Sequence, residues 1–252
     1  MAAVAASVPS KGAPMIRRLA SVAGVTLLAA GLLAGCASTA GTESPEPDET
    51  VPADSEEIEV EAAWLDGGRM IGIVTEGSST CVPSAGEVTY DDGVLQVELV
   101  EVPADTACTS DLVARATVAG LPEGIDTTRE LEVFVTGDGY HGEAELDPVP
   151  GLDQSGETDY LPSAGWTDKD GQFVILTWGS STCVPAIENV EGSGQEVTVT
   201  FMTPPEDQAC TMDMAPRAVV VQAEGVDDDA EVTAILTGGE FDDVRIPIVG
   251  HD

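Results

Sequence analysis

Basic residues, aromatic residues and histidine are all scarce in this chain. The shortages of basic residues and of histidine each argue against a class of function. The 252 residues include 9 Lys and Arg against 46 Asp and Glu, for a formal net charge of −37. So acidic a chain repels phosphate backbones and anionic lipid headgroups, which excludes direct nucleic-acid binding. Two histidines leave little material for histidine-based catalysis. Hydrophobic residues nevertheless make up 42% of the chain, enough to build buried cores.

The first 35 residues differ in charge from the rest. They contain Lys11, Arg17, Arg18 and no acid, so the remainder carries all 46 acids and six bases. A basic start at residues 15–18 is followed by an apolar run and small residues, which predicts a secretory signal peptide over 1–35. Residues 1–14 lack leader character, so Met15 is a candidate start. The apolar run is also short for a permanent membrane span.

The leader ends in a recognisable motif. Leu33-Ala34-Gly35-Cys36 resembles the lipobox of bacterial lipoproteins. The resemblance implies diacylation of Cys36, with palmitate among the attached chains, and cleavage before it. It places the protein on the cell membrane, lipid-anchored at the extracytoplasmic face. The alternatives are an ordinary leader with an incidental cysteine, or an uncleaved anchor.

Residues 36–61 follow the lipidation motif and read as an acidic disordered tether. The segment holds nine acids and several prolines, with no base and no aromatic residue. It cannot bury enough apolar surface to offset the entropy of ordering, and like charges keep it extended.

A tandem repeat organises the rest of the chain. Gly-Ser-Ser-Thr-Cys-Val-Pro at residues 77–83 recurs at residues 179–185, an offset of 102. The same offset relates Trp64 to Trp166. We therefore expect repeat 1 at 62–150, a linker at 151–163 and repeat 2 at 164–252.

Within each repeat the apolar residues follow period two, which is typical of β-strands. The runs lie at residues 70–74, 94–99 and 131–135 in repeat 1, and at 172–176, 196–201 and 232–236 in repeat 2. The runs at 70–74 and 172–176 are nearly continuous, as expected of a central strand, and the others alternate cleanly. Turn residues such as Asp91-Asp92-Gly93 separate them. The predicted fold is all-β, with two tandem homologous β-sandwich domains of immunoglobulin-like type, each stapled by a disulfide.

Four cysteines follow Cys36, and an exported chain favours disulfides. Three pairings are open, but the identical spacing of 27 residues favours Cys81–Cys108 and Cys183–Cys210. Each loop is expected to add about 3.5 kcal/mol of stability. A zinc site is disfavoured because the repeats share no histidine.

Few residues have a catalytic pattern. The serines of Gly-Ser-Ser-Thr-Cys need a nearby base to act as nucleophiles, but His141 corresponds to Asp242 in the second copy. We therefore interpret this segment as a strand end that turns into a disulfide. Trp64 and Trp166 are expected to fill the cores, with sugar stacking as the alternative.

Two Asp–Arg pairs are the remaining candidates. Asp111 with Arg115, and Asp213 with Arg217, are placed identically in both copies. Each pair predicts either an ion pair or an arginine that anchors the backbone. The functional alternative is an arginine that binds a carboxylate ligand.

Acid clusters raise the question of Ca²⁺. The candidates are Asp227-Asp228-Asp229, and Asp168 with Asp170. An EF-hand is excluded for the second because Gly179 stands where a glutamate is required. We expect no cofactor beyond weak association with Ca²⁺.

The lipobox, the acidic tether, Gly-Ser-Ser-Thr-Cys and a downstream Ala-Cys-Thr-x-Asp-x-x-x-Arg together resemble uncharacterised secreted lipoproteins of high-GC Gram-positive bacteria. This resemblance implies a location and no activity. A duplicated module favours binding, because two linked sites gain avidity. The chain is thus expected to be a non-catalytic binding or structural module of the envelope, recognising a protein or a glycan. The alternatives are a carboxylate-based extracellular hydrolase and an accessory or sensor subunit.

Overall fold

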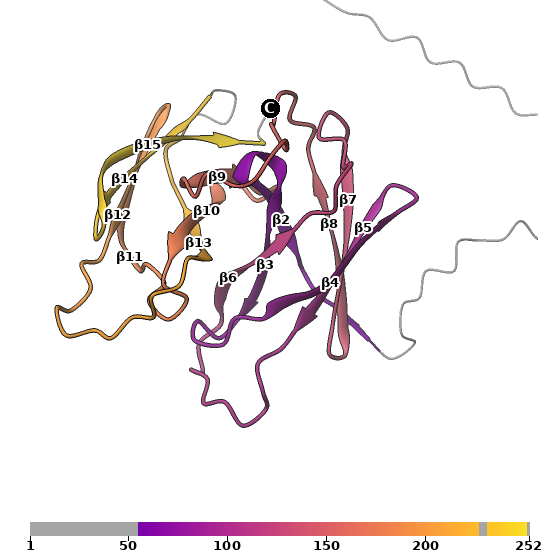
Figure 1. Ribbon diagram of the computed structural model, residues 1–252, viewed down its shortest axis with the longest axis horizontal. Coiled ribbons are helices and arrows are strands. Elements are labelled where there is room, and N and C mark those ends of the chain that lie inside the picture. Colours follow the sequence, from indigo (N-terminus) through magenta and orange to yellow (C-terminus); the bar gives the residue numbers. More distant parts are fainter. Residues whose placement is uncertain (1–54, 227–230, 251–252) are drawn as a thin grey trace, which may run out of the picture. The chain divides into compact units, whose positions relative to one another are not determined.

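A computed structural model describes residues 55–226 and 231–250 (Figure 1). All of them belong to one compact unit, Glu49–Asp252. The predicted signal peptide, Cys36, residues 36–54 of the tether and the cluster Asp227-Asp228-Asp229 lie outside the described residues. Among the described residues, no helix has both the length and the apolar character needed to cross a membrane.

In the described residues, the regular structure consists of strands and one short 3₁₀ helix. Repeat 1 and its approach contain β1 (Glu56–Glu57), β2 (Glu61–Leu65), the 3₁₀ turn η1 (Asp66–Gly68), β3 (Met70–Gly77), β4 (Ser84–Asp91), β5 (Val94–Val100), β6 (Val113–Gly120), β7 (Leu131–Gly137) and β8 (Tyr140–Leu146). Repeat 2 contains β9 (Ser163–Trp166), β10 (Gln172–Gly179), β11 (Ile187–Ser193), β12 (Glu196–Phe201), β13 (Ala215–Gln222), β14 (Thr233–Gly238) and β15 (Phe241–Val249). The all-β prediction is confirmed, and each strand from β2 to β8 has its counterpart from β9 to β15.

The strands of repeat 1 form two sheets, ordered β2-β3-β6 and β1-β8-β7-β5-β4. In repeat 2 the same two groups join into one seven-stranded order, because the end of β15 pairs with β9 in parallel. β5 pairs with β7, and β12 with β14, in parallel. This differs from the expected immunoglobulin-like sandwich, whose two sheets are antiparallel. In sequence, β6 lies between β5 and β7, and β13 lies between β12 and β14. Each of these intervening strands belongs to the other strand group of its repeat, so the chain crosses over and comes back parallel to the strand it left.

Each repeat has its own hydrophobic core. In repeat 1, Trp64, Ile71 and Ile73 from the three-stranded sheet pack with Leu95 and Val133 from the five-stranded sheet. The alternating pattern of β5 sends one set of side chains into this core and leaves the other exposed. Repeat 2 builds the equivalent cluster around Trp166, Phe173 and Val197. Both tryptophans are therefore buried, as expected for core residues.

A third cluster joins the two repeats and explains why β3 and β10 read as continuous apolar runs. Alternate residues of each strand face their own core, while Val74 of β3 and Val174 and Leu176 of β10 belong to the shared cluster. The backbones approach closely here: a Cβ on Gly165 would lie 2.2 Å from the carbonyl oxygen of Trp64. The two repeats are thus packed face to face through β2-β3-β6 and β9-β10-β13.

The predicted disulfides Cys81–Cys108 and Cys183–Cys210 are both present, each with its Cα atoms 5.6 Å apart. The Cys81 amide donates to the Ser78 carbonyl and the Cys183 amide to the Ser180 carbonyl, so each Ser-Ser-Thr-Cys segment is a turn. That turn connects the end of β3 or β10 to the disulfide, as the sequence predicted.

Candidate functional site

A group of hydroxyls and one carboxylate surrounds the disulfide turn of each repeat, and we call it the hydroxyl cluster. In repeat 1 the Thr109 hydroxyl lies 2.7 Å from that of Ser78 and 3.2 Å from that of Thr80. The Thr109 amide donates to the Thr80 hydroxyl at 3.0 Å. Asp111 completes the cluster by accepting a hydrogen bond from the Ser79 amide at 3.3 Å. The cluster ties the turn before the first cysteine to the segment after the second.

Repeat 2 reproduces the hydroxyl cluster contact for contact. The Thr211 hydroxyl lies 2.8 Å from that of Ser180 and 3.3 Å from that of Thr182, whose hydroxyl accepts from the Thr211 amide at 3.1 Å. Asp213 accepts from the Ser181 amide at 3.2 Å and also from the Thr211 hydroxyl. The duplication has therefore kept the polar contacts as well as the sequence.

The carboxylates of the two clusters are unusually acidic. Hydrogen bonds from Ser79 and then Thr109 lower the pKa of Asp111 from 3.8 to about 2. Ser181 and then Thr211 do the same for Asp213, again to about 2. Hydrogen bonds to a carboxylate stabilise its charged form, so both clusters carry a fixed negative charge.

The expected Asp111–Arg115 and Asp213–Arg217 ion pairs are not among the ion pairs of the described residues. Arg115 donates to the Cys81 carbonyl, and Arg217 donates to the Cys183 carbonyl at 3.0 Å. Both contacts are those of an arginine that anchors the backbone, which was the other role expected for these residues. The arginines reach the first cysteine of each disulfide because they extend from β6 and β13, next to the turn.

The first glycine of each Gly-Ser-Ser-Thr-Cys segment makes room for that arginine. A Cβ on Gly77 would lie 2.4 Å from Cζ of Arg115, and one on Gly179 would lie 2.7 Å from Cζ of Arg217. Both distances are far below van der Waals contact, so the guanidinium lies against the glycine backbone.

The two arginines differ in their acidic partner. In repeat 1 the partner is Glu101, just after β5, with Nη2 3.8 Å from Oε1. Tyr140, the first residue of β8, donates its hydroxyl to the same carboxylate at 2.8 Å. Burial and this hydrogen bond to Glu101 raise the pKa of Tyr140. A Tyr140–Glu101–Arg115 chain therefore spans this end of repeat 1.

In repeat 2 the acidic partner comes from the β14–β15 turn. Glu240 lies 2.5 Å from the Arg217 guanidinium, which also donates to the Trp178 carbonyl. Phe241 stands where repeat 1 has Tyr140, and its ring packs on Phe201 with centroids 4.9 Å apart. A groove of about 460 Å³ lies here, and we call it the repeat 2 groove. Its lining includes Val184, Pro185, Met202, Pro204, Arg217, Glu240 and Phe241.

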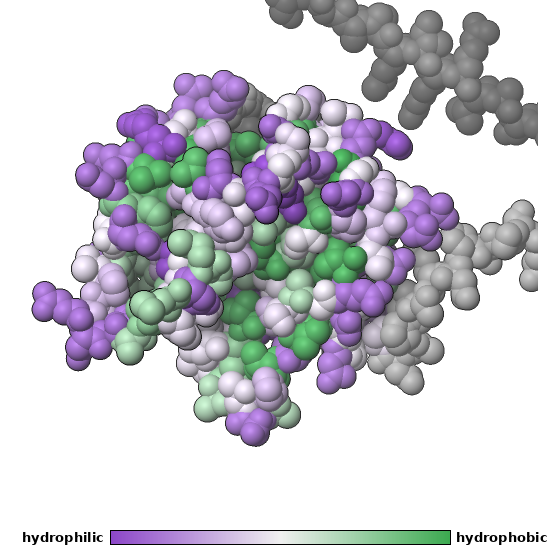
Figure 2. All heavy atoms as spheres, in the orientation of Figure 1, coloured by the Kyte–Doolittle hydropathy of each residue, from purple (hydrophilic) through white to green (hydrophobic). Residues whose placement is uncertain are grey.

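Exposed apolar residues occur at matched positions near both disulfides. Val82 matches Val184, Val100 matches Met202, and Leu112 matches Met214, and all six are exposed. In Figure 2, hydrophobic residues (green) appear among hydrophilic ones (purple) at the lower edge of the view, where the loop between β5 and β6 lies in Figure 1. Each hydroxyl cluster thus has apolar neighbours that the described chain leaves uncovered.

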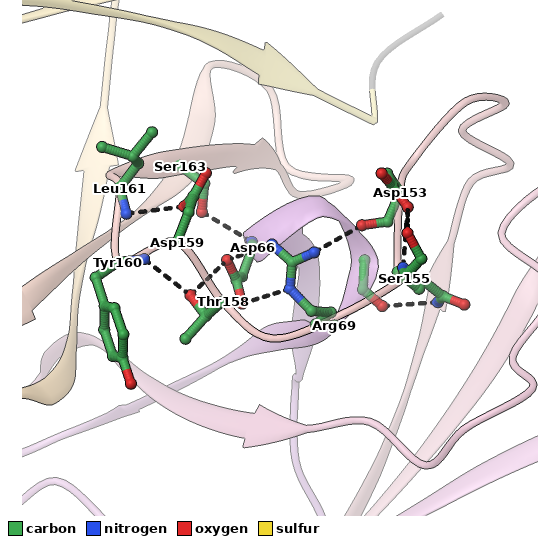
Figure 3. A network of polar contacts seen from close by, with 11 residues as sticks. Asp66, Arg69, Asp153, Ser155, Thr158, Asp159, Tyr160, Leu161 and Ser163 are labelled. Carbon is green, nitrogen blue, oxygen red and sulfur yellow. Dashed lines mark hydrogen bonds and ion pairs between the residues drawn. The ribbon is translucent and has the colours of Figure 1, made fainter.

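A second polar network lies where the predicted linker meets repeat 1 (Figure 3). The buried carboxylate of Asp66 accepts two hydrogen bonds from Arg69, at 2.9 and 3.0 Å, and one from the Thr158 hydroxyl at 3.1 Å. Arg69 also donates to the Asp153 carbonyl at 2.7 Å. Asp66 is buried and Arg69 is half-buried, and both charges are hydrogen-bonded, which offsets the cost of taking the carboxylate out of water.

Through this network the predicted linker is hydrogen-bonded to repeat 1 and forms part of the interface between the repeats. The side chain of Gln154 donates to the Gly68 carbonyl at 2.7 Å, and the Ser163 hydroxyl accepts from the Asp66 amide at 2.8 Å. Linker and repeat 1 are thus bonded at several points. These contacts hold the repeats together and suit a structural role.

A carboxylate occupies the pseudo-symmetric position on the other side of the interface. Glu61 accepts a hydrogen bond from the Asp168 amide. Partial burial of Glu61 and the nearby charges of Asp168 and Glu59 raise its pKa, although Lys169 opposes this effect. Lys169 also forms an ion pair with Glu59 at 3.7 Å.

The other candidates from the sequence are placed apart from the hydroxyl clusters. His141 Nδ1 lies 2.9 Å from the hydroxyl of Ser55, so its partner belongs to the segment before β2. Asp168 and Asp170 lie in the turn between β9 and β10. Within residues 55–226 and 231–250, no three His, Cys, Asp or Glu side chains form a group that could hold a metal ion.

Sequence reasoning did not identify Asp66, Arg69, Glu101 or Glu240 as site residues. Two of them had a signal in the sequence. Asp66-Gly67-Gly68-Arg69 pairs one of six bases outside the leader with a turn, and Gly67 and Gly68 adopt positive φ there. Glu101 and Glu240 had no such signal, because each repeat supplies the partner of its arginine from a different strand end.

The chain matches no protein-family model, no curated protein and no solved structure.

Proposed function

We propose that this protein is a lipid-anchored binding module of the cell envelope, held on the extracytoplasmic face by Cys36. Its two repeats present matched, non-catalytic sites at their disulfide ends for an envelope protein or a glycan. We further propose that each repeat behaves as one β-sandwich unit, since each has a hydrophobic core built from both of its strand groups.

One observation carries this proposal: the contacts around the two disulfides are duplicated although they lie on the surface. Buried residues keep their positions after a duplication because packing requires it. Ser79, Thr80 and Thr109 are exposed, as are Ser181, Thr182 and Thr211, and packing places no such demand on them. Paired sites on one chain give avidity when both engage the same partner.

The chemistry of the cluster suits recognition better than catalysis. A serine nucleophile needs a base within hydrogen-bond reach. The hydroxyls of Ser78 and Ser180 instead contact threonine hydroxyls. Asp111 and Asp213, with pKa values of about 2, are weak bases. Such groups form a rigid set of donors and acceptors beside exposed apolar side chains.

Lipid anchoring is tested by mass spectrometry of the membrane-bound protein. We expect a mature chain that begins at diacylated Cys36. An unmodified peptide that spans Gly35 and Cys36 would contradict the anchor.

Binding is tested by capture from an envelope extract with the full chain immobilised. The exposed residues Val82 and Val184 are changed to Ser singly and together. We expect each single variant to retain less partner, by about tenfold, and the double variant to retain none. Equal capture by the parent and the double variant would contradict the proposal.

A further inference from the structure

The loop between β12 and β13, residues 202–214, is unusually rich in exposed methionine. Met202, Met212 and Met214 are 54%, 104% and 61% exposed. Met70, the other methionine within the described residues, packs against the cluster between the repeats. Methionine is flexible and polarizable, and surfaces that bind apolar partners of varied shape use it often. Three exposed methionines on one loop therefore indicate a binding surface.

The same loop forms one wall of the repeat 2 groove. Met202, Phe241 and Glu240 all line the groove, and the Glu240 side chain is 56% exposed. The volume of about 460 Å³ lies in the range of ligand-binding clefts, about 300–1,000 Å³. An apolar side chain can thus enter the groove while a neighbouring group meets the carboxylate.

The exposed charges of the loop and of Glu240 are all negative. Glu206, Asp207 and Asp213 are exposed on the loop, which contains no Lys or Arg. The nearby base, Arg217, is buried and paired with Glu240. An apolar groove with an acidic rim is complementary to a segment that is apolar on one side and basic on the other.

We propose that the repeat 2 groove and the methionine loop bind a basic amphipathic segment of a partner protein. This inference rests on the proposed binding function and names the chemistry of the partner. A second copy of the chain is disfavoured by like charge, and so is the acidic tether. Apolar side chains of the segment contact Met202, Met214 and Phe241, while its Lys or Arg residues lie over the acidic rim.

Repeat 1 provides an internal comparison. Phe241 and Thr203, both in the groove lining, correspond to Tyr140 and Glu101. In repeat 1 the Tyr140 hydroxyl donates a 2.8 Å hydrogen bond to the Glu101 carboxylate, a contact that Phe241 and Thr203 cannot reproduce. The same basic segment is therefore expected to bind repeat 2 in preference to repeat 1.

Methionine-methyl NMR tests the proposal on the full chain carrying Cys36→Ser, which removes the lipid. The probe is a synthetic amphipathic peptide of about 14 Leu and Lys residues. We expect it to shift the methyl signals of Met202, Met212 and Met214 and to leave that of Met70 in place. A peptide with Glu in place of Lys should shift none of them. Equal shifts with both peptides, or no shift of the three loop methyls, would overturn the proposal.

Matched variants locate the binding surface. Met202→Ser with Met214→Ser should weaken peptide binding by about tenfold, while Val100→Ser with Leu112→Ser in repeat 1 should leave it unchanged. An equal loss in both pairs would overturn the assignment to repeat 2.

Envelope capture separates this inference from the proposed function. If the Met202→Ser/Met214→Ser variant still captures the partner in full, the partner binds elsewhere on the protein and this inference fails. If the parent protein binds the peptide but captures no partner, the proposed function fails.

Discussion

The hydroxyl of Ser163, the last residue of the predicted linker and the first of β9, accepts a hydrogen bond from the backbone amide of Asp66 in repeat 1, across 2.8 Å. Its pseudo-symmetric copy is also present, because Glu61 accepts from the Asp168 amide. The offset of 102 relates Glu61 to Ser163 and Asp66 to Asp168. Each contact thus has a counterpart in which the two repeats exchange roles, which is the pattern of a two-fold dimer interface. The duplication has joined, in one chain, an interface with the form of a symmetric dimer.

Ser163→Ala tests this contact from the repeat 2 side. The Asp66 amide would lose its acceptor, and an unsatisfied buried donor costs about 1–3 kcal/mol. We expect the free energy of unfolding in urea to fall by about that amount. Ser110→Ala, at an exposed loop position, is the control and should change it by less than about 0.5 kcal/mol. Equal stability of the two variants would show that the amide finds another partner.

Glu61→Gln tests the pseudo-symmetric contact and gives it a pH dependence. The folded state raises the pKa of Glu61, chiefly by burial, so the folded protein holds this proton more tightly than the unfolded chain. The ionised group therefore opposes folding increasingly as pH rises. Gln keeps an acceptor oxygen for the Asp168 amide and carries no charge. We expect Glu61→Gln to be more stable than the parent near neutral pH, with the difference disappearing in acid.

The control for this variant is Glu57→Gln, which removes the same charge from an exposed residue. Denaturation curves at about pH 7 and about pH 3 distinguish the two. A gain shared equally by both variants would show that relief of the overall negative charge, rather than the position of Glu61, is responsible.

The repeat, the strand class and the disulfides could be predicted because each has a local signature. An identical seven-residue segment reveals the duplication, and the spacing of Cys81 and Cys108 is repeated at Cys183 and Cys210. The packing between the repeats could not be read in the same way. The nearly continuous apolar run of β3 predicted a central strand, but not that one face of this strand meets β10 of the other repeat.

The site residues show the same division between local and tertiary information. Arg115 and Arg217 could be singled out because both copies contain them. Their acidic partners could not, since Glu101 follows β5 and Glu240 precedes β15. Only the folded arrangement brings either carboxylate to its arginine. The sequence therefore suggested Asp111 and Asp213, which are close in sequence but are bonded to hydroxyls.

Ser181→Ala tests the cause of the acidity of Asp213. The hydroxyl of Ser181 makes the largest contribution to lowering this pKa to about 2, so its removal should raise the pKa toward 3.8. Asp111 keeps its own hydroxyls and should still titrate at about 2, which makes repeat 1 the internal control. Carboxyl-carbon NMR during an acid titration reports both values. Unchanged titration of Asp213 would exclude the hydroxyl as the cause.

The acidity of Asp213 also has a consequence for stability. Because the folded pKa lies below the unfolded one, the hydrogen bonds stabilise the protein fully above the unfolded value. This stabilisation is lost as pH falls from the unfolded pKa through about 2. Ser181→Ala should therefore lose less stability than the parent across that acid range. A parallel loss in both proteins would contradict the linkage.

Gly77→Ala tests the close contact between glycine and arginine. The new methyl group would lie 2.4 Å from Cζ of Arg115, so the guanidinium must move and its bond to the Cys81 carbonyl is strained. Overpacking of this kind costs about 1–3 kcal/mol. Gly120→Ala, whose Cβ would meet nothing within 4 Å, should leave the unfolding free energy unchanged or raise it by up to about 1 kcal/mol.

The double variant Gly77→Ala/Arg115→Ala decides whether that contact is the cause. If the guanidinium is what the methyl group displaces, the alanine at position 77 should cost nothing once Arg115 is absent, and the two effects should not add. Urea denaturation of the four proteins in this cycle measures the coupling. Additive losses would show that Gly77 serves the turn itself and that Arg115 does not determine the residue at that position.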